Sequence, residues 1–205
     1  MKTIALIGYS GYAYVVFEIF FSQGQTVSAY ADKTENKKNP YALKWLGVED
    51  ETSVIETLKE YTYFVSIGDN KIRQQVSEKL IKKLGQPENA LHKSAIISRS
   101  MNAGTGNMFA PRVVINPFVQ IGNGVICNTG CIVEHECVIH DYAHIAPGAV
   151  LCGNVTVGEG SFIGAGAVIK QGVTIGKNVI VGAGAVIVKN IEHNQKVVGN
   201  PHRIL

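Results

Sequence analysis

The sequence has no long hydrophobic run, no run of basic residues and no CxxC pair. The apolar run VVFEIFF (15–21) contains Glu18 and is far shorter than the ~20 residues that a membrane-spanning helix needs. The start, MKTIALIG, has an early Lys, but a Gly-rich turn follows its short apolar run, so we expect no signal peptide. These absences predict a cytoplasmic protein that is not inserted into a membrane.

Charge is also scarce, at 17% of residues with a net charge of +3. Without a basic stripe that alternates with aromatic residues, nucleic acid is not expected as a partner. The four cysteines stand singly in apolar sequence, which favours reduced, buried thiols over a disulfide framework. They are Cys127, Cys131, Cys137 and Cys152.

The first half of the chain alternates between strand-like and helix-like segments. This alternation predicts a parallel sheet of three or four strands in a small Rossmann-like domain, residues 1–90. A polar segment, 34–51, is expected to be either an ordered flap or a mobile loop. We predict strands at 3–8, 27–32 and 62–69, and helices at 12–23, 53–61 and 70–85.

The second half follows a different period. Every sixth residue from Ile97 to Ile187 is apolar, and small or β-branched residues stand two positions before most of these. Such a period fits neither an α-helix nor an ordinary strand. It predicts a β-helix whose three short faces form a coil of eighteen residues, with about five coils within residues 91–205. The tail KVVGNPHRIL either closes over a ligand or caps the last coil.

The polar residues of CIVEHECVIHDYAHIAPG (131–148) stand between members of this apolar ladder, and they are compatible with a metal site, a catalytic base or a solvated corner. His135 and His144 are half a coil apart, which disfavours a shared metal. We expect His144 to point outward and to gain apolar surroundings from a neighbouring subunit. A carboxylate beside an imidazole fixes its tautomer and suits a general base. Glu136 can support His135 in this way only if the corner bends the two together.

Two features of the first half suit a nucleotide. The turn GYSG (8–11) precedes a helix and presents backbone N–H groups to a diphosphate, but GYSGYA is not GxGxxG, which disfavours a nicotinamide dinucleotide. Asp32 ends the second strand, where a carboxylate accepts hydrogen bonds from a sugar or base; a helix cap or a solvated acid is the alternative.

Together, the six-residue ladder, the stretch EHECVI…YAHIAPGAVLCGNVTVG and the tail VVGNP resemble the left-handed β-helix acyltransferases. The Gly turn, Asp32 and SIGDNKIR (66–73) narrow this to the bacterial nucleotide-sugar acetyltransferases. These comprise UDP-4-amino-sugar N-acetyltransferases and related sialic acid O-acetyltransferases. The resemblance implies a Rossmann-like domain followed by a left-handed parallel β-helix, acetyl-CoA as co-substrate without a metal, and a bacterial homotrimer whose active sites lie between subunits.

The same resemblance implies roles for particular residues. His135 would be the general base, with Glu136 orienting it. His144 would contact acetyl-CoA near the thioester from an adjacent subunit. Tyr12 stands where this family commonly has His, Tyr9 where it has a small residue, and His140 where it has Gly. The implied CoA groove includes the backbone of Ala165 and Ala183. The implied nucleotide-sugar contacts are Ser10, Gly11, Tyr12, Asp32, Lys33 and Gly68.

The predicted function is therefore acetyl transfer from acetyl-CoA to the amino group of a nucleotide-linked sugar, a UDP-4-amino-4,6-dideoxy sugar, in surface glycan biosynthesis. O-acetylation of a sialic acid or similar sugar is an alternative, because an amine and a hydroxyl acceptor both need a base. A non-catalytic protein that binds nucleotide sugars is a third possibility. The departures at Tyr9, Tyr12 and His140 leave the sugar and the nucleotide open.

Overall fold

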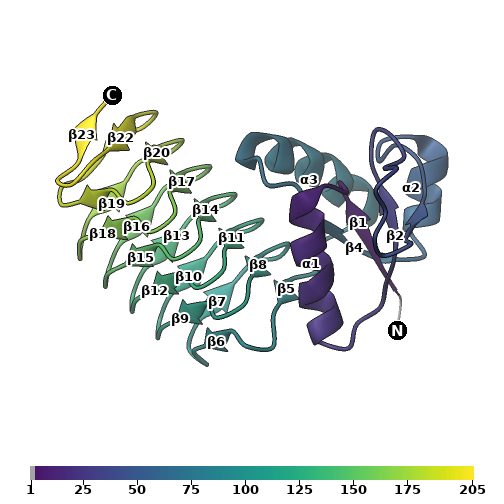
Figure 1. Cartoon of the computed structure of the whole chain (residues 1–205), viewed down its shortest axis with the longest axis horizontal. Helices are drawn as coiled ribbons and strands as arrows, with labels where there is room; N and C mark the ends of the chain where they lie inside the picture. The colour runs from purple at the N-terminus through teal and green to yellow at the C-terminus, as the bar shows by residue number, and fades with distance from the viewer. Residues whose placement is uncertain (1–2) are drawn as a thin grey trace.

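A computed structural model describes residues 3–205. An N-terminal α/β domain packs against a β-helix, and the chain ends at the end of that helix away from the N-terminal sheet (Figure 1). The predicted fold, a Rossmann-like domain followed by a left-handed parallel β-helix, is confirmed. The strand β5 (Ala90–Leu91) spans the predicted domain boundary and pairs with β8 of the β-helix.

The N-terminal sheet is parallel, with strand order β3-β2-β1-β4. Each predicted strand and helix is present, and β3, within 34–51, was not predicted. All the predicted elements are shorter than predicted except α1, which keeps the predicted length of 12 residues and begins one residue earlier. Asp69 caps α3 because its Oδ1 accepts a hydrogen bond from the N–H of Ile72 at 2.9 Å. The strands are β1 (Ile4–Ile7), β2 (Val27–Ala31), β3 (Lys44–Trp45) and β4 (Thr62–Val65). The helices are α1 (Gly11–Ser22), α2 (Thr52–Leu58) and α3 (Asn70–Leu84).

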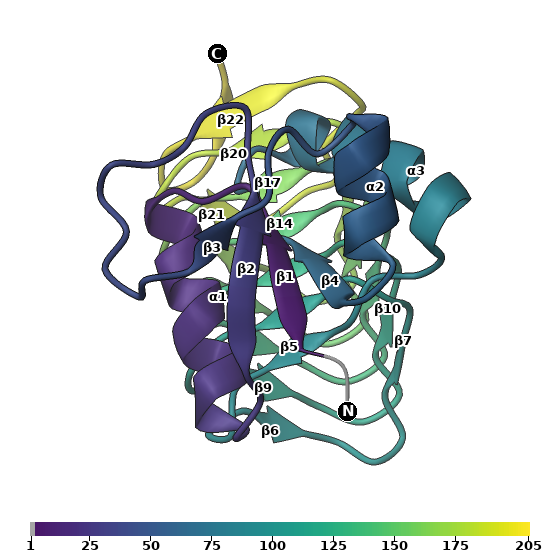
Figure 2. The ribbon, with the colours of Figure 1, turned by 90° about the vertical axis from the view of Figure 1, so that its right-hand side faces the viewer.

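The two faces of this sheet are both buried, which explains the unbroken apolar sequence of β1. Ile4 and Leu6 belong to the cluster that contains α1 and the interior of the β-helix. Ala5 and Ile7 pack with residues of α2 and α3 on the other side. Figure 2 shows α1 on one side of the sheet and α2 with α3 on the other. The N-terminal domain and the β-helix therefore share one hydrophobic cluster.

Residues 34–51 form an ordered segment, which decides between the two alternatives above. Tyr41 stacks on Phe17 of α1 with ring centroids 3.7 Å apart, and its hydroxyl donates to Glu18. The amide of Asn36 donates to the carbonyl of Tyr9 at 2.7 Å. The segment thus fastens α1 and the loop that precedes it.

The β-helix consists of three flat faces of very short parallel strands. Face 1 contains β7 (Asn102–Ala103), β10 (Gln120–Ile121), β13 (Val138–Ile139), β16 (Thr156–Val157) and β19 (Thr174–Ile175). Face 2 contains β5, β8 (Met108–Phe109), β11 (Ile126–Cys127), β14 (His144–Ile145), β17 (Phe162–Ile163), β20 (Ile180–Val181), β22 (Lys196–Val198) and β23 (Arg203–Ile204). Face 3 contains β6 (Ile96–Ile97), β9 (Val114–Ile115), β12 (Ile132–Val133), β15 (Val150–Leu151), β18 (Val168–Ile169) and β21 (Val186–Ile187).

Strands pair with the strand eighteen residues later, as Ile121 does with Ile139, so the predicted coil length is confirmed. The ladder is buried from Phe109 to Ile187. Its first two members, Ile97 and Ala103, are not buried, because no coil stacks below the first one. At each corner the backbone turns through a positive φ every six residues, from Gly106 to Gly184.

The C-terminal tail caps the last coil. Ile180 of β20 pairs with Lys196 of β22, sixteen residues on instead of eighteen, and β23 then returns antiparallel to β22. Val197 is fully buried. Of the two interpretations of the tail, the structure shows capping.

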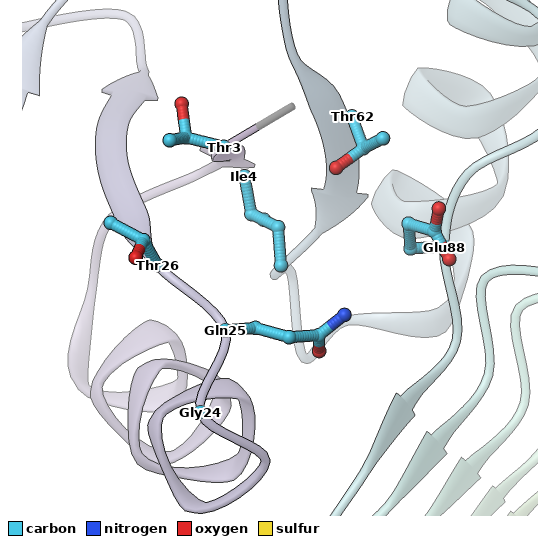
Figure 3. A pocket seen from close by; sticks show the side chains of 7 residues that line it. All are labelled: Thr3, Ile4, Gly24, Gln25, Thr26, Thr62 and Glu88. Carbon is cyan, nitrogen blue, oxygen red and sulfur yellow. The ribbon is translucent and has the colours of Figure 1, made fainter. Parts of the chain in front are cut away.

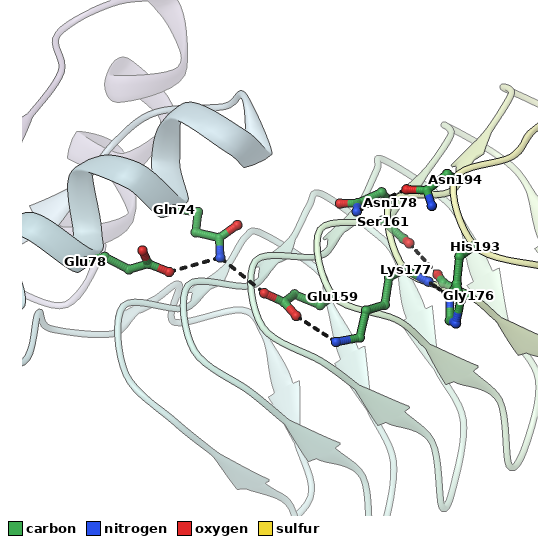
Figure 4. A network of polar contacts seen from close by, with 9 residues as sticks. All are labelled: Gln74, Glu78, Glu159, Ser161, Gly176, Lys177, Asn178, His193 and Asn194. Carbon is green, nitrogen blue, oxygen red and sulfur yellow. Dashed lines mark hydrogen bonds and ion pairs between the residues drawn. The ribbon is translucent and has the colours of Figure 1, made fainter.

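The N-terminal domain contacts the β-helix along face 2 and the corner between faces 1 and 2. The hydroxyl of Tyr12 donates to the sulfur of Met108, and the amide of Asn70 donates to the carbonyls of Gly160 and Ser161. Gln74 of α3 donates to Glu159, which pairs with Lys177 one coil further on (Figure 4). These contacts fix the position of α3 over the coils.

Candidate active site

A cavity of about 690 Å³ lies at the carboxyl ends of β1, β2 and β4. Ligands of open α/β sheets bind at this edge, beyond the strand ends. Four of the residues predicted to contact the nucleotide sugar line the cavity: Ser10, Asp32, Lys33 and Gly68. Lining residues that were not predicted include Tyr9, Glu49, Asp50, Asp69, Gln75 and Lys79.

Asp32 connects the two loops at this edge. One carboxylate oxygen accepts the N–H of Tyr9 at 2.7 Å and the other accepts the N–H of Lys33 at 2.7 Å. Each oxygen keeps a second lone pair for a ligand. Asp32 therefore orients the Gly turn as well as facing the cavity, and it does not cap a helix.

The predicted contacts of the Gly turn divide into two groups. Ser10 precedes α1, and Gly11 begins it. The backbone N–H groups in the first turn of a helix have no hydrogen-bond partner within that helix. The side chain of Tyr12 instead points to Met108 on face 2. Tyr12 and Gly11 are outside the cavity lining, which on this loop consists of Gly8, Tyr9 and Ser10, the residues directly before α1.

A second cavity, of about 710 Å³, adjoins the first where Gly68 and Asp69 line both. It lies between the start of α3 and face 2, with Phe162 and Ile180 on its apolar side. A ligand that spans both cavities would thus reach from the N-terminal sheet to the β-helix along Gly68.

His144 is buried beside this junction, with 8% of its surface exposed. It points outward from face 2 as predicted, but the residues that cover it belong to its own chain. Its ring packs edge-on against that of Phe162 with ring centroids 4.8 Å apart, and its Nε2 lies 3.2 Å from the amide nitrogen of Asn128. The expectation that a neighbouring subunit supplies these surroundings is wrong, because the N-terminal domain already covers face 2.

The electrostatics of His144 favour the neutral imidazole. Burial, and then the charge of Arg73, lower the pKa of His144 to about 4, against a smaller opposing effect of the Gly68 backbone. Its Nδ1 is the one buried side-chain nitrogen or oxygen in residues 3–205 without a hydrogen-bond partner. The neutral ring thus lies buried against the backbone of Gly68, which lines both cavities.

Arg73, which is not among the predicted site residues, is buried at 1% exposure beside the same turn. Burial lowers its pKa to about 10, so it is charged at neutral pH. On α3 it shares a face with Ser77 and Leu80, four and seven residues later. That spacing is the signal that could have identified a buried cation.

His135 and Glu136 form a pair at the corner between faces 3 and 1. Nδ1 of His135 lies 3.0 Å from Oε2 of Glu136. Glu136 adopts a φ of 60°, and this left-handed turn brings two adjacent side chains together. Because a carboxylate only accepts, Nδ1 carries the hydrogen and Nε2 keeps a lone pair. The imidazole is half exposed, so Nε2 is open to a substrate.

Gly153, eighteen residues after His135, lies directly below this imidazole. A Cβ placed on Gly153 would be 2.6 Å from both Cε1 and Nε2 of His135. Because Gly153 has no side chain, the imidazole of His135 lies directly against its backbone.

The predicted site residues lie at three separate places around one β-helix. His135 is at the corner between faces 3 and 1, and the N-terminal domain covers face 2 with the corner between faces 1 and 2. Ala165 and Ala183 are exposed at the corner between faces 2 and 3. One chain consequently does not bring His135 to the cavities at Gly68. No group of three or more His, Cys, Asp or Glu that could hold a metal ion occurs in residues 3–205.

A third cavity, of about 320 Å³, lies at the opposite edge of the N-terminal sheet (Figure 3). It is lined by residues that precede or begin strands, such as Ile4, Thr26 and Thr62. It is at the amino ends of the strands, away from the edge where such sheets bind ligands.

Two family models match the chain: the PglD N-terminal domain over residues 3–80, and the bacterial transferase hexapeptide (six repeats) over residues 154–189. A crystal structure of a histidine variant of GDP-perosamine N-acetyltransferase from Caulobacter crescentus, in complex with CoA and GDP-perosamine, is 34% identical. It matches with a TM-score of 0.93 over 100% of this chain and 97% of that one. This chain belongs to the nucleotide-sugar acetyltransferases of the hexapeptide-repeat family.

Two further relatives of this family support the assignment. The acetyltransferase domain of PglB from Neisseria gonorrhoeae, in complex with acetyl coenzyme A, is 32% identical with a TM-score of 0.93, covering 100% of this chain and 99% of that one. GDP-perosamine N-acetyltransferase of Escherichia coli O157:H7 is 38% identical over 106 residues, which span 52% of this chain and about half (48%) of that enzyme.

The family and enzyme class predicted from the sequence are confirmed, and the relatives that hold CoA or acetyl-CoA bear out the predicted co-substrate. Two of these relatives carry GDP in the name of their sugar, whereas the nucleotide predicted from the sequence is UDP. Within residues 3–205, none of the helices has the length and apolar character needed to cross a membrane. The trimer, the cytoplasmic location and the roles of individual site residues stay predictions.

Proposed function

We propose that this protein transfers the acetyl group of acetyl-CoA to the amino group of a GDP-linked 4-amino-4,6-dideoxy sugar, perosamine or a close analogue. The observation that carries the chemistry is the His135–Glu136 pair, which leaves Nε2 of an accessible imidazole free to accept a proton. The GDP-perosamine enzymes among the relatives support the nucleotide and the sugar. This replaces the uridine nucleotide of the sequence-based prediction.

The reaction needs a neutral amine, because an ammonium has no lone pair for attack. The amine nitrogen attacks the thioester carbonyl, and a new C–N bond forms. Nε2 of His135 takes the proton that this nitrogen loses, a contribution of roughly 10²–10⁴-fold in rate. The C–S bond then breaks, and CoA leaves as a thiolate that becomes protonated. Glu136 holds the ring in one tautomer throughout.

The nucleotide sugar binds, in this proposal, across the two cavities that meet at Gly68. The diphosphate faces the N–H groups at the start of α1, where the helix dipole favours negative charge. Ser10, Asp32 and Lys33 contact the nucleotide sugar in the first cavity. The sugar reaches the second, where Phe162 and Ile180 offer an apolar surface to a deoxy carbon.

His135 must then come from another copy of the chain, because the corner that holds it is on a different edge from face 2. We propose a homotrimer in which each active site combines the cavities of one subunit with the His135 corner of the next. CoA lies along the coils at the corner of Ala165 and Ala183. His144 supports the turn at Gly68 from below, in the subunit that holds the nucleotide sugar.

The test measures release of the CoA thiol with GDP- and UDP-linked 4-amino sugars and with free sialic acid. We expect release with the GDP-linked amino sugar, and a loss of at least 10²-fold in His135→Ala. Release with sialic acid alone would replace this proposal by O-acetylation. Unchanged turnover in His135→Ala would remove the proposed base, and a solution mass near the 22.1 kDa of one chain would exclude a shared site.

A further inference from the structure

Arg73 makes an unusual set of contacts for a buried cation. Its five N–H donors all bond to uncharged amide oxygens. Nε donates to Gly124 at 2.8 Å, and Nη2 to Tyr142 and to the Asn70 side chain, both at 2.9 Å. Nη1 donates to Ile67 at 3.1 Å and to Gly68 at 3.0 Å. Arg73 makes no ion pair within residues 3–205, although an unpaired buried charge is costly.

The two bonds from Nη1 determine how the turn at Gly68 faces the cavities. In a planar trans peptide, the C=O and the N–H point in opposite directions. Because the carbonyls of Ile67 and Gly68 both point at Arg73, the N–H groups of Gly68 and Asp69 point away from it. Neither N–H donates to any group in the described part of the chain. Both cavities are lined by Gly68 and Asp69, so two free donors lie side by side where they meet.

The acceptor that suits these donors is an anionic or strongly polar oxygen. Consecutive free N–H groups at the start of a helix form a site for phosphate oxygens. The unpaired Nδ1 of His144, buried beside Gly68, is a second group at this junction that has no partner of its own. Arg73 also bonds to Gly124 and Tyr142 of the β-helix, so one side chain connects the turn, α3 and face 2.

We propose that Arg73 is a positioning residue for the nucleotide sugar. It holds the peptides of Ile67–Asp69 so that two N–H groups face the diphosphate or the adjoining sugar oxygens, and it fastens this turn to the β-helix. This inference rests on the proposed function, since it concerns the acceptor site of that reaction. Arg73 itself does not touch the substrate.

The test compares Arg73→Met and Arg73→Lys with Arg99→Met, an exposed arginine on the first coil. Lys has three donors and cannot reproduce five bonds in a fixed fork. We expect the KM for the nucleotide sugar and the Kd for GDP to rise about 10- to 100-fold in Arg73→Met, as for the loss of one or two hydrogen bonds to a charged acceptor. Arg73→Lys should show a smaller rise, and Arg99→Met none.

The KM for acetyl-CoA separates positioning from general damage, since CoA is expected on another corner of the β-helix. It should stay within about twofold in all three variants. If Arg73→Met does not fold, Arg73→Lys decides the question. Folded variants with wild-type KM and Kd for the nucleotide sugar and GDP would overturn the inference, and so would an equal rise in the KM for acetyl-CoA.

Titrating GDP and UDP into the wild-type protein distinguishes failure of this inference from failure of the proposed function. Absence of turnover with every amino sugar would end the proposed function, while a weaker Kd in the Arg73 variants would still support the role of Arg73. Binding of neither nucleotide by the wild type would overturn the inference itself.

Discussion

Replacing Gly153 by Ala should disable the proposed base without removing it. The added Cβ would lie 2.6 Å from Nε2 of His135, where ordinary contact begins at 3.4 Å. The backbone of Gly153 needs no positive φ, so Ala fits the local conformation. The imidazole must therefore move by nearly 1 Å, and a misplacement of that size costs about 10²-fold in rate. We expect kcat to fall by about that factor, equivalent to about 2.7 kcal/mol in the activation free energy.

The assay is thiol release at saturating acetyl-CoA over a range of nucleotide-sugar concentrations. The KM for the nucleotide sugar should change less than about twofold, because that ligand is held by the N-terminal domain. Gln171→Ala, at the same corner position one coil later, is the matched control and should behave as wild type. Adding Gly153→Ala to His135→Ala should cause no further loss. A wild-type kcat in Gly153→Ala would refute the reasoning that this imidazole position is required.

Three further changes test other parts of the structure. Glu136→Gln keeps the size of the side chain but weakens its hold on Nδ1 of His135, so kcat should fall about tenfold or more in the thiol-release assay while the melting temperature stays constant. Burial and Arg73 hold the pKa of His144 near 4, so as the pH falls the unfolded chain binds a proton at this residue before the folded chain does. The free energy of unfolding should therefore fall by about 3 kcal/mol between pH 6.5 and 4. Urea titrations should show a weaker dependence of this free energy on pH in His144→Gln. Ser161→Ala removes a buried hydroxyl that donates to Gly176 and accepts from the N–H of Val179, so it should lower the free energy of unfolding by about 1–3 kcal/mol, whereas an unchanged urea midpoint would contradict the role of these bonds.

The β-helix could be predicted from sequence because its core repeats at a fixed interval. Each inward residue stacks on the one eighteen positions away, so a single pattern specifies every coil. The pattern does not predict burial at Ile97 and Ala103, where the stack of coils begins. It also ends after Ile187, where strands pair sixteen residues apart instead of eighteen. The strand β3 was not predicted because two residues, Lys44 and Trp45, are too few to show a period.

The candidate site was only partly predictable, since its residues meet through the packing of two domains. His135 and Glu136 are adjacent in sequence, and only the positive φ at the corner makes them neighbours in space. The burial of His144 depends on Gly68 and the N-terminal domain, which no local pattern reveals. Arg73 was interpreted as part of an ordinary amphipathic helix, because its acceptors belong to distant segments of the chain.

The strongest consequence of this arrangement is that two inactive variants should restore each other. His135→Ala damages the corner that one subunit gives, and Asp32→Ala damages the cavity that the other subunit gives. In a trimer with sites between subunits, random mixing of equal amounts of both chains leaves about one quarter of the sites with an intact residue of each kind. Unfolding the two together and refolding them should thus recover about a quarter of wild-type activity, against at least a tenfold loss in either variant refolded alone. If His135 served the cavity of its own chain, every site in the mixture would carry one of the two substitutions, and activity would stay at the level of the separate variants.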